Sequence, residues 1–321
     1  MTISSHETWQ VQDATKIQAY MVCPRKYFYE YVLGWRTKVP SNHLVFGTAW
    51  HLAMEVVLEE GTAPDSLAKA YKAFESNYRE TFDPTWDDGH SPKNPATVLR
   101  ALPMYAEKYA DDDFKVLRIE VAGSIPVDSR RVIHFKEDTI CEGREGIFSL
   151  EHKTGSSYSD SWISQWPQKM QVGVYTHALY SMYPENQVWG VKINGFFPHA
   201  PMRMRKDGLP YKGAKDIEFH RVPIRRDIKS LNAWLWEVNR WLDNIEDDFQ
   251  RLSESTEDDP IMEAFPKNTE SCTKYGKKCD FFDYCTSWHN PLREAHEPPM
   301  DFHVQHWDPR NMDHVRETIK L

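Results

Sequence analysis

A change of hydrophobic period at Lys115 restricts the folds open to this 321-residue chain more than any other feature. From there, apolar and polar residues alternate as in β-strands through three consecutive segments, 116–127, 130–142 and 147–155. Further strand-like segments, which include 188–197 and 217–224, follow after an intervening helical stretch. Strands interrupted by a helix in this order predict a mixed α/β layer fold.

Helical spacing dominates the residues before that change. Residues 13–33 carry apolar side chains on one face, and Pro24 within them marks the start of a second helix. The next helical segment, 46–60, places His51 and Glu55 four residues apart and therefore side by side on one face.

Two more helices are expected within and after the strand region. The first covers 164–183, and the second, over 228–249, has apolar residues three and four apart along its length. This stripe predicts a helix that faces the core, in which Trp234 and Trp241 are packing residues and not part of a cofactor site.

Composition allows a large core and limits the classes of partner. The chain is 40% apolar and 13% aromatic, enough for one large or two modest domains. A basic leader followed by an apolar segment is not seen, nor is an 18-residue apolar run, so we expect a cytoplasmic protein without membrane contact. The net charge of -9 argues against a surface that broadly coats nucleic acid.

Basic residues nevertheless concentrate in residues 203–215 and at Arg225 and Arg226. They predict either a solvated hairpin or a flap that follows phosphates between two strands. Aromatic residues that could stack on bases, or could simply pack, are Tyr158, Trp162 and Trp166.

The turn at residues 143–146 sets the register of the second and third strands. With glycine at both ends of the turn, Asp138 should lie opposite Glu151. Because side chains alternate along a strand, Asp138, Glu151 and Lys153 should share one face and the His152 side chain should point away.

Two carboxylates opposite each other are destabilising in a sheet, and a divalent cation would remove that repulsion. The oxygens of Asp138 and Glu151, together with the His152 carbonyl, suit Mg²⁺ or Mn²⁺. With Lys153 beside the cation, the chemistry predicted is hydrolysis of a phosphodiester bond. The alternative is an ordinary surface hairpin in which Glu151 and Lys153 pair with each other.

Several short motifs carry a family resemblance. The run E-H-K-T-G over 151–155 resembles the D/E-x-K-T-G core of the PD-(D/E)XK nuclease superfamily, and Asp138 falls where that family places an earlier acid. FGTAWH, which ends at His51, resembles the G-T-x-x-H segment of RecB-like exonucleases, and Gln171 with Tyr175 is similar to their Q-x-x-x-Y signature.

This resemblance implies a role for each matching residue. It makes His51 a metal ligand, Asp138 and Glu151 the acidic ligands, and Lys153 the catalytic lysine. The pair Gln171 and Tyr175, four apart on one helix face, would support the site or contact DNA.

One departure from the family pattern concerns the earlier acid. The family usually places a glycine-containing turn before it, whereas this chain has HFKEDTIC. Glu137 and Glu120 are therefore alternative ligands to Asp138, and Glu137 would require a one-residue slip that flips the strand faces.

The five cysteines suggest a second centre. Cys272, Cys279 and Cys285 have the spacing C-x6-C-x5-C, Cys23 begins CPRKYFYEYV, and Cys141 is expected to be a small core residue on the face opposite Asp138. Without an export signal, clustered thiols favour a metal over disulfides.

One N-terminal cysteine, Cys23, and three C-terminal ones, Cys272, Cys279 and Cys285, form a pattern that resembles the iron-sulfur segment of RecB-like nucleases of the AddB and CRISPR-associated kind. This resemblance implies a 4Fe-4S cluster. The family spacing is C-x2-C-x5-C, so zinc held by four thiolates remains an alternative, and reduced thiols without metal a further one.

Together these features predict a PD-(D/E)XK restriction-endonuclease-like core with a mixed central sheet. The expected parts are a helical N-terminal region (1–114), the nuclease core (115–250), a C-terminal cysteine segment (251–290) and a tail (291–321) that is interrupted by proline, then helical, and docks a protein partner.

The predicted function is a metal-dependent DNA exonuclease. It would act on single-stranded DNA or DNA ends in repair, recombination, or phage or CRISPR DNA processing. The alternatives are a nucleic-acid-binding or assembly module that does not cleave, and an iron-sulfur redox protein, which leaves the E-H-K-T-G hairpin unexplained.

Overall fold

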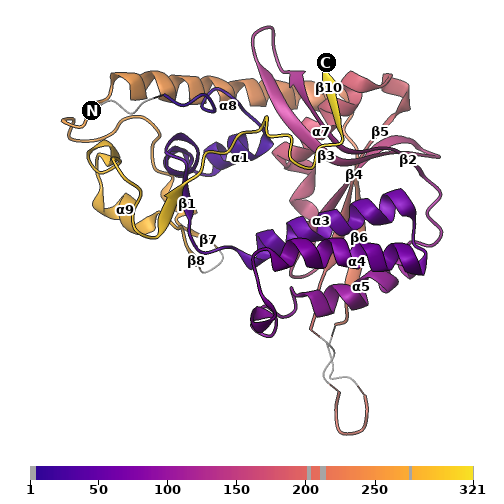
Figure 1. Ribbon diagram of the computed structural model, residues 1–321. Coiled ribbons are helices and arrows are strands. Elements are labelled where there is room, and N and C mark those ends of the chain that lie inside the picture. Colours follow the sequence, from indigo (N-terminus) through magenta and orange to yellow (C-terminus); the bar gives the residue numbers. More distant parts are fainter. Residues whose placement is uncertain (1–4, 201–203, 210–214, 275–276, 321) are drawn as a thin grey trace.

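The strand-like half of the chain forms one six-stranded mixed sheet. A computed structural model describes all residues except 1–4, 201–203, 210–214, 275–276 and 321 (Figure 1). The strand order is β10-β2-β3-β4-β5-β6, with β4/β5 and β10/β2 parallel and the other neighbours antiparallel. The strands are β2 (Lys115–Pro126), β3 (Val132–Gly143), β4 (Gly146–Thr154), β5 (Val188–Phe197), β6 (Glu218–Ile224) and β10 (Glu317–Lys320).

The predicted register of the β3–β4 hairpin is confirmed. Gly143 pairs with Gly146, and the ladder continues to Thr139 opposite Leu150. Gly146 adopts a φ of 127°, a conformation that L residues rarely take, so glycine at the turn fixes where the hairpin folds back.

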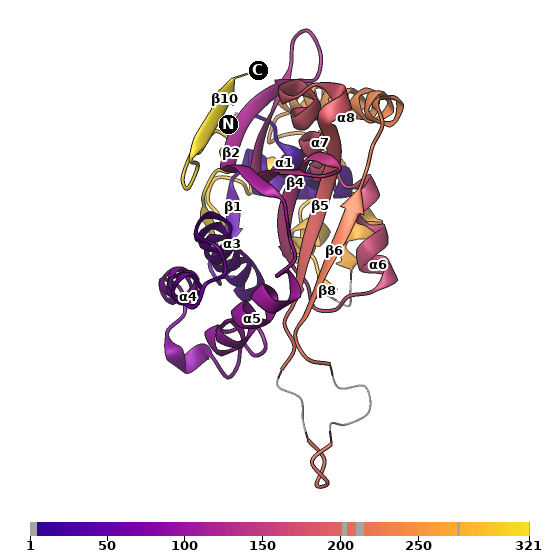
Figure 2. The ribbon, with the colours of Figure 1, turned by 90° about the vertical axis from the view of Figure 1, so that its right-hand side faces the viewer.

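Helices cover both faces of the sheet (Figure 2). On one face lie α3 (Asn42–Glu60), α4 (Pro64–Arg79) and α5 (Pro95–Lys108), and on the other lie α6 (Asp160–Ser164), α7 (Met170–Met182) and α8 (Ile228–Glu254). Each side has its own buried apolar cluster, as expected for an α/β layer fold. No helix within the described ranges has the length and apolarity needed to cross a bilayer.

The apolar stripe predicted for the long C-terminal helix is confirmed in α8. Buried residues along it recur three and four apart, and Trp234 packs against α7 at Gly173. The helix begins at Asp227, whose carboxylate accepts a hydrogen bond of 2.8 Å from the Ser230 N–H.

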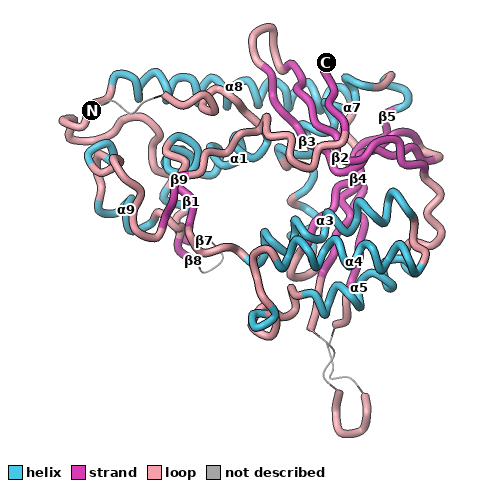
Figure 3. The backbone as a smooth tube through the Cα atoms, in the orientation of Figure 1, coloured by secondary structure: helices cyan, strands magenta, loops and turns pink. Residues whose placement is uncertain are grey.

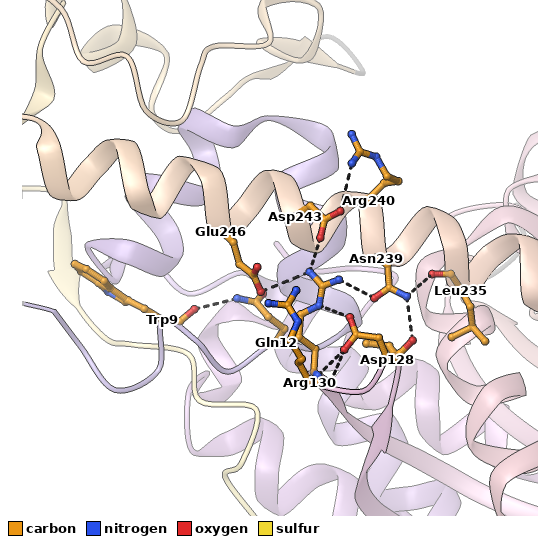
Figure 4. A network of polar contacts seen from close by, with 11 residues as sticks. Trp9, Gln12, Asp128, Arg130, Leu235, Asn239, Arg240, Asp243 and Glu246 are labelled. Carbon is orange, nitrogen blue, oxygen red and sulfur yellow. Dashed lines mark hydrogen bonds and ion pairs between the residues drawn. The ribbon is translucent and has the colours of Figure 1, made fainter.

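A polar network ties the β2–β3 turn to α8 (Figure 4). The guanidinium of Arg131 donates to Asp128 in its own turn at 2.7 Å, and to Asp243 and Asn239 of α8 at 2.8 and 3.0 Å. Asn239 in turn donates to the Val127 carbonyl at 2.9 Å, so the turn and the helix hold each other.

The first helices and the segment after α8 form a second body of structure, at the left of Figures 1 and 3. Pro24 does begin a new helix there, as predicted. The elements are α1 (Ala14–Val22), α2 (Pro24–Tyr27), the π-helical turn η1 (Phe28–Val32), β1 (Trp35–Thr37), β7 (Thr273–Lys274), β8 (Lys277–Lys278), α9 (Phe282–Ser287) and β9 (Phe302–Val304). The 3-10 turns η5 (Thr269–Ser271) and η6 (Pro291–Arg293) also follow α8, whereas η2 (Pro84–Trp86), η3 (Trp166–Gln168) and η4 (Glu185–Gln187) lie elsewhere.

The tail differs from the helix expected for it. After the turn η6, its described residues include two short strands, β9 paired with β1 and β10 paired with β2. Between them, Trp307 donates from Nε1 to the Asp13 carboxylate at 2.8 Å. A sheet edge offers unpaired N–H and C=O groups, and this tertiary partner overrides the weak local helical preference.

Candidate active site

Glu151 and Lys153 lie together on β4, the strand between β3 and β5. Glu151 is 1% exposed, and the Lys153 ammonium forms an ion pair with its Oε1. Burial and the nearby Asp138 raise the pKa of Glu151, and Lys153 opposes them. The second oxygen, Oε2, is buried without a hydrogen-bond partner, which is costly for a carboxylate.

Asp138 is held by two donors. Its Oδ1 lies 3.3 Å from Nδ1 of His51 on α3, and its Oδ2 accepts a hydrogen bond of 2.7 Å from the backbone N–H of His152. Burial alone would raise the pKa of Asp138, but His51 outweighs it and the pKa lies below its usual value. In the same pair, burial would lower the pKa of His51, but the Asp138 carboxylate raises it to about 9.

Side-chain alternation predicted that Asp138 and Glu151 share one face of the sheet, whereas in the structure Asp138 contacts His51 of α3 and Glu151 contacts Gln171 of α7, two helices that cover opposite faces. The β3–β4 ladder ends one pair before Asp138 and Glu151. Glu137 lies opposite Val121 on β2, and Val121 belongs to the same buried cluster as Ile140. On a regular strand, residues three apart such as Glu137 and Ile140 would point to opposite faces. The alternation of side-chain direction therefore breaks between Glu137 and Ile140, and the Asp138 side chain faces His51 of α3.

Gln171 and Tyr175 of α7 connect Glu151 to the backbone of β3. The Gln171 amide donates to Glu151 Oε1 at 3.1 Å and to the Tyr175 hydroxyl at 2.6 Å. That hydroxyl donates to the carbonyl of Lys136 at 2.6 Å. Both residues thus support the acid, which is one of the two roles that the sequence left open.

The His152 side chain lies apart from Glu151, as predicted. Its Nδ1 lies 3.1 Å from the amide Nδ2 of Asn194, which also donates to the Tyr105 hydroxyl at 2.9 Å. Burial lowers the pKa of His152 to about 3, so the imidazole is neutral. Only the backbone of this residue reaches Asp138. Since the N–H and C=O of a strand residue point the same way, its carbonyl is also directed to that side.

Of the two alternative acids, Glu137 lies near Glu151 and Asp138, whose charges add to the effect of burial on its pKa. It is fully buried beside Val121 with neither carboxyl oxygen hydrogen-bonded, and burial raises its pKa well above the usual value. Glu120 lies near Asp138 and has a φ of 48°. Burial and Asp138 together raise the pKa of Glu120 to about 8.

Further residues near the site were not predicted. The guanidinium of Arg316, in the tail, lies 3.2 Å from Glu55 and 2.7 Å from Glu59 of α3. The backbone N–H of Arg316 donates to the Glu120 carbonyl at 2.9 Å. His51, Glu55 and Glu59 follow one another at four-residue intervals. That acidic helix face was the available signal, but the sequence did not indicate its cationic partner.

The glycine that ends the E-H-K-T-G run is required by packing. A Cβ at Gly155 would lie 2.6 Å from the Phe197 ring, so only glycine fits. The neighbouring aromatics pack as well: Trp162 lies edge-on to Trp166 and to Phe197, and Tyr158 stacks on His220 at 3.6 Å.

The β5–β6 connection extends away from the sheet (Figure 2). Parts of the basic segment predicted there, including Arg203 and Lys212, lie outside the described residues. Of the described ones, Arg205 pairs with Asp207 at 2.9 Å and Lys215 with Glu218 at 3.3 Å.

Four cysteines from the two ends of the chain come together in the second body. The Cys23 sulfur accepts a 3.4 Å hydrogen bond from Asn268, whose carbonyl lies 3.9 Å from the Cys272 sulfur. The N–H of Cys279 donates to the Cys272 carbonyl at 2.8 Å. Burial raises the pKa of the Cys285 thiol to about 11, with smaller contributions from Cys23 and Cys279.

Cys141 belongs to none of this. It is buried with Phe148 and Leu150, as predicted, but it packs near Leu58 of α3, the helix that Asp138 also faces, and not on the opposite face. Across the described part of the chain, no three His, Cys, Asp or Glu side chains already surround one point as metal ligands. At the sheet, Lys153 and His51 occupy the positions next to the carboxylates.

Comparison with known families decides the class of this protein. The model of the PD-(D/E)XK nuclease superfamily matches residues 14–286, most of the chain. The chain belongs to the PD-(D/E)XK nuclease superfamily. No curated protein matches it. Among solved structures, the one described as "Crystal structure of SSO0001" is similar at 10% identity over 74% of this chain and 89% of that chain, with a TM-score of 0.25, too low to carry an argument.

Membership of the superfamily supports a mixed α/β nuclease fold, nuclease activity and a DNA substrate.

Proposed function

We propose that this superfamily member is a metal-dependent DNA exonuclease acting in the cytoplasm on single strands or DNA ends. The observation that carries the proposal is the unpartnered, buried Oε2 of Glu151 beside Asp138 and Lys153. A buried carboxylate oxygen without a donor suits a cation better than it suits the apolar interior.

The donor set fits a hard cation. His51, Asp138, Glu151 and the His152 carbonyl would hold Mg²⁺ or Mn²⁺. When bound, such an ion supplies positive charge to the phosphate and lowers the pKa of a water. The protein contributes the rest: Lys153 brings an ammonium beside Glu151, and Gln171 with Tyr175 fixes the orientation of that carboxylate.

Metal-dependent digestion of end-labelled DNA tests the proposal. We expect single- and double-stranded linear DNA to be degraded only with Mg²⁺ or Mn²⁺, and Lys153→Ala or Glu151→Gln to abolish degradation. Lys192→Ala and Glu145→Gln are matched controls because the Lys192 side chain reaches over the Phe148 ring to Glu145 in the β3–β4 turn. Degradation of closed circular DNA would contradict exonuclease action, and intact linear DNA with tight binding would favour a non-cleaving module.

We further propose that Cys23, Cys272, Cys279 and Cys285 hold a 4Fe-4S cluster, with zinc as the alternative. Four thiols without disulfides, drawn from residues 23 and 272–285, have the donor chemistry for either metal. The centre would join the N-terminal region to the cysteine segment, the first and third of the four parts proposed from the sequence.

Metal analysis of protein purified without oxygen separates these possibilities. A brown protein with about four iron atoms per chain supports the cluster, and a colourless one with a single zinc refutes it. Cys272→Ser should lose the metal, whereas Cys141→Ser should keep it because Cys141 lies in a separate cluster.

A further inference from the structure

Two buried donors without partners lie beside the proposed cysteine centre. Arg25 is 3% exposed and Tyr29 is fully buried, and both belong to the segment that begins with Cys23. The Nη1 atom of Arg25 and the hydroxyl of Tyr29 have no hydrogen-bond partner. Buried donors, and a buried cation most of all, are strongly destabilising when unpaired.

The remaining donors of Arg25 are explained by local structure. Its Nε donates to the Phe265 carbonyl at 2.9 Å and its Nη2 to the Met262 carbonyl at 3.2 Å, while the backbone N–H donates to Pro266 at 3.1 Å. These bonds fasten the first helices to the segment before Asn268, which donates to the Cys23 sulfur. Among the described residues, no carboxylate lies within ion-pair distance of Arg25.

Packing explains the ring of Tyr29 but not its hydroxyl. The ring stacks on Phe281 at 4.9 Å and on Trp35 at 5.4 Å. Phenylalanine would make the same contacts. The hydroxyl lies beside the Arg25 guanidinium and the Cys285 sulfur, and both influence its pKa, but no partner meets the geometry of a full hydrogen bond.

We propose that Arg25 and Tyr29 are positioning residues that donate to the Cys285 sulfur once the centre holds its metal. A thiolate bound to metal carries negative charge and accepts N–H and O–H donors, so loading would satisfy both orphaned groups. The inference rests on the proposed cysteine centre and applies to iron-sulfur and zinc alike.

The test compares the rate at which loaded protein releases metal to a colorimetric chelator. Tyr29→Phe should release it about tenfold faster than wild type, the usual effect of losing a hydrogen bond to a ligand. Tyr31→Phe is the matched control, since Tyr31 lies in the same turn, buried, with the Arg36 guanidinium 4.8 Å from its ring centre. Equal rates for Tyr29→Phe and wild type would overturn the role of Tyr29.

Arg25→Lys tests the other donor, with Arg36→Lys as its control. A lysine keeps the charge, but its three N–H groups sit on one nitrogen and cannot reach acceptors spread around a planar guanidinium, so we expect a similar rise in release rate. An unchanged rate would overturn the role of Arg25. If the lysine variant fails to accumulate, Tyr29→Phe still decides.

An iron-loaded protein gives a readout that a purely structural role would not move. Donors to sulfur favour the more negative, reduced cluster, so at a fixed solution potential set by dithionite the reduced-to-oxidised ratio of Tyr29→Phe should fall. A tenfold fall corresponds to about 59 mV for a one-electron couple. Wild-type protein that carries no metal would refute the cysteine centre itself, whereas loaded wild type with identical variants would refute only this inference.

Discussion

At the scale of single residues, the site is a set of charges held by specific donors. Glu151 is oriented by Lys153 and Gln171, and Asp138 by His51 and the His152 backbone. Each contact opposes the repulsion between the two carboxylates. For a cation to bind, His51 and Lys153 would have to move, because they now contact the carboxylate oxygens that the cation would bind.

The hydroxyl of Tyr175 should matter for catalysis although it does not reach Glu151. Tyr175→Phe removes the acceptor for Gln171 and the donor to Lys136. We expect DNA hydrolysis to fall by about tenfold to hundredfold, because small misplacements of a catalytic group are costly. Tyr180→Phe removes a hydroxyl of the same helix that donates to Arg226 at 3.1 Å, and should keep the wild-type rate. Full activity of Tyr175→Phe would show that the hydrogen-bond chain is dispensable.

Lys16 should make stability depend on pH. It is 1% exposed and donates to the carbonyls of Thr8 and Val11 at 2.7 Å, and burial lowers its pKa from 10.5 to about 8. Between pH 8 and pH 10.5 the unfolded chain binds more protons at Lys16 than the folded chain does, so the free energy of unfolding rises with pH. Below pH 8 Lys16 is protonated in both states and contributes no slope.

Urea unfolding of wild type and Lys16→Met at several pH values measures this effect. The free energy of unfolding of wild type, relative to that of Lys16→Met, should rise by on the order of 3 kcal/mol between the folded and unfolded pKa values of Lys16. A flat or declining difference would contradict the assignment of the slope to Lys16.

At the scale of elements, the position of the acid depends on an interruption in β3. A regular strand would place Glu137 and Ile140 on opposite faces, yet both associate with the core cluster of α7 and α8. The irregularity turns Asp138 toward α3. Glu120, with its positive φ, occupies the neighbouring part of β2.

The packing of α7 on α8 should tolerate no side chain at Gly173. A Cβ there would lie 2.2 Å from the Trp234 indole. Alanine improves helix propensity by about 1 kcal/mol, but overpacking costs about 1–3 kcal/mol or more. We therefore expect Gly173→Ala to lower the free energy of unfolding, measured in urea.

A smaller ring at position 234 should relieve the clash with a Cβ at position 173. Gly173→Ala combined with Trp234→Phe should lose less stability than the sum of the two single changes. A single Gly173→Ala variant more stable than wild type would show that α8 moves away without cost.

At the scale of the whole molecule, the two ends of the chain hold its bodies together. Residues 302–320 pair with β1, contact Asp13 through Trp307 and complete the sheet beside β2. The four cysteines join residue 23 to 272–285 in the second body. A tail expected to dock a partner is thus engaged within its own chain.

Removal of the tail after Pro299 tests its contribution. The free energy of unfolding should fall by a few kcal/mol, since each lost hydrogen bond contributes about 1 kcal/mol, and the exposed edge of β2 should promote association visible by light scattering. Arg316→Gln, which removes only half-exposed ion pairs to Glu55 and Glu59, should change stability by less than about 1 kcal/mol. Unchanged stability after truncation would mean that the tail is a passive appendage.

The sequence by itself determined what depends on neighbours along the chain. The β3–β4 register follows from glycines at a tight turn and a period of two, and the buried stripe of α8 follows from a period of 3.6. The placement of Gln171 and Tyr175 on one helix face follows from the same helical period.

Only the tertiary structure decided the contacts between distant segments. His51 meets Asp138 because α3 crosses the sheet where β3 is irregular, and the tail becomes a strand because β2 presents an open edge. Neither outcome has a local signature, since the stabilising partner lies elsewhere in the chain and the backbone groups themselves carry no sequence pattern.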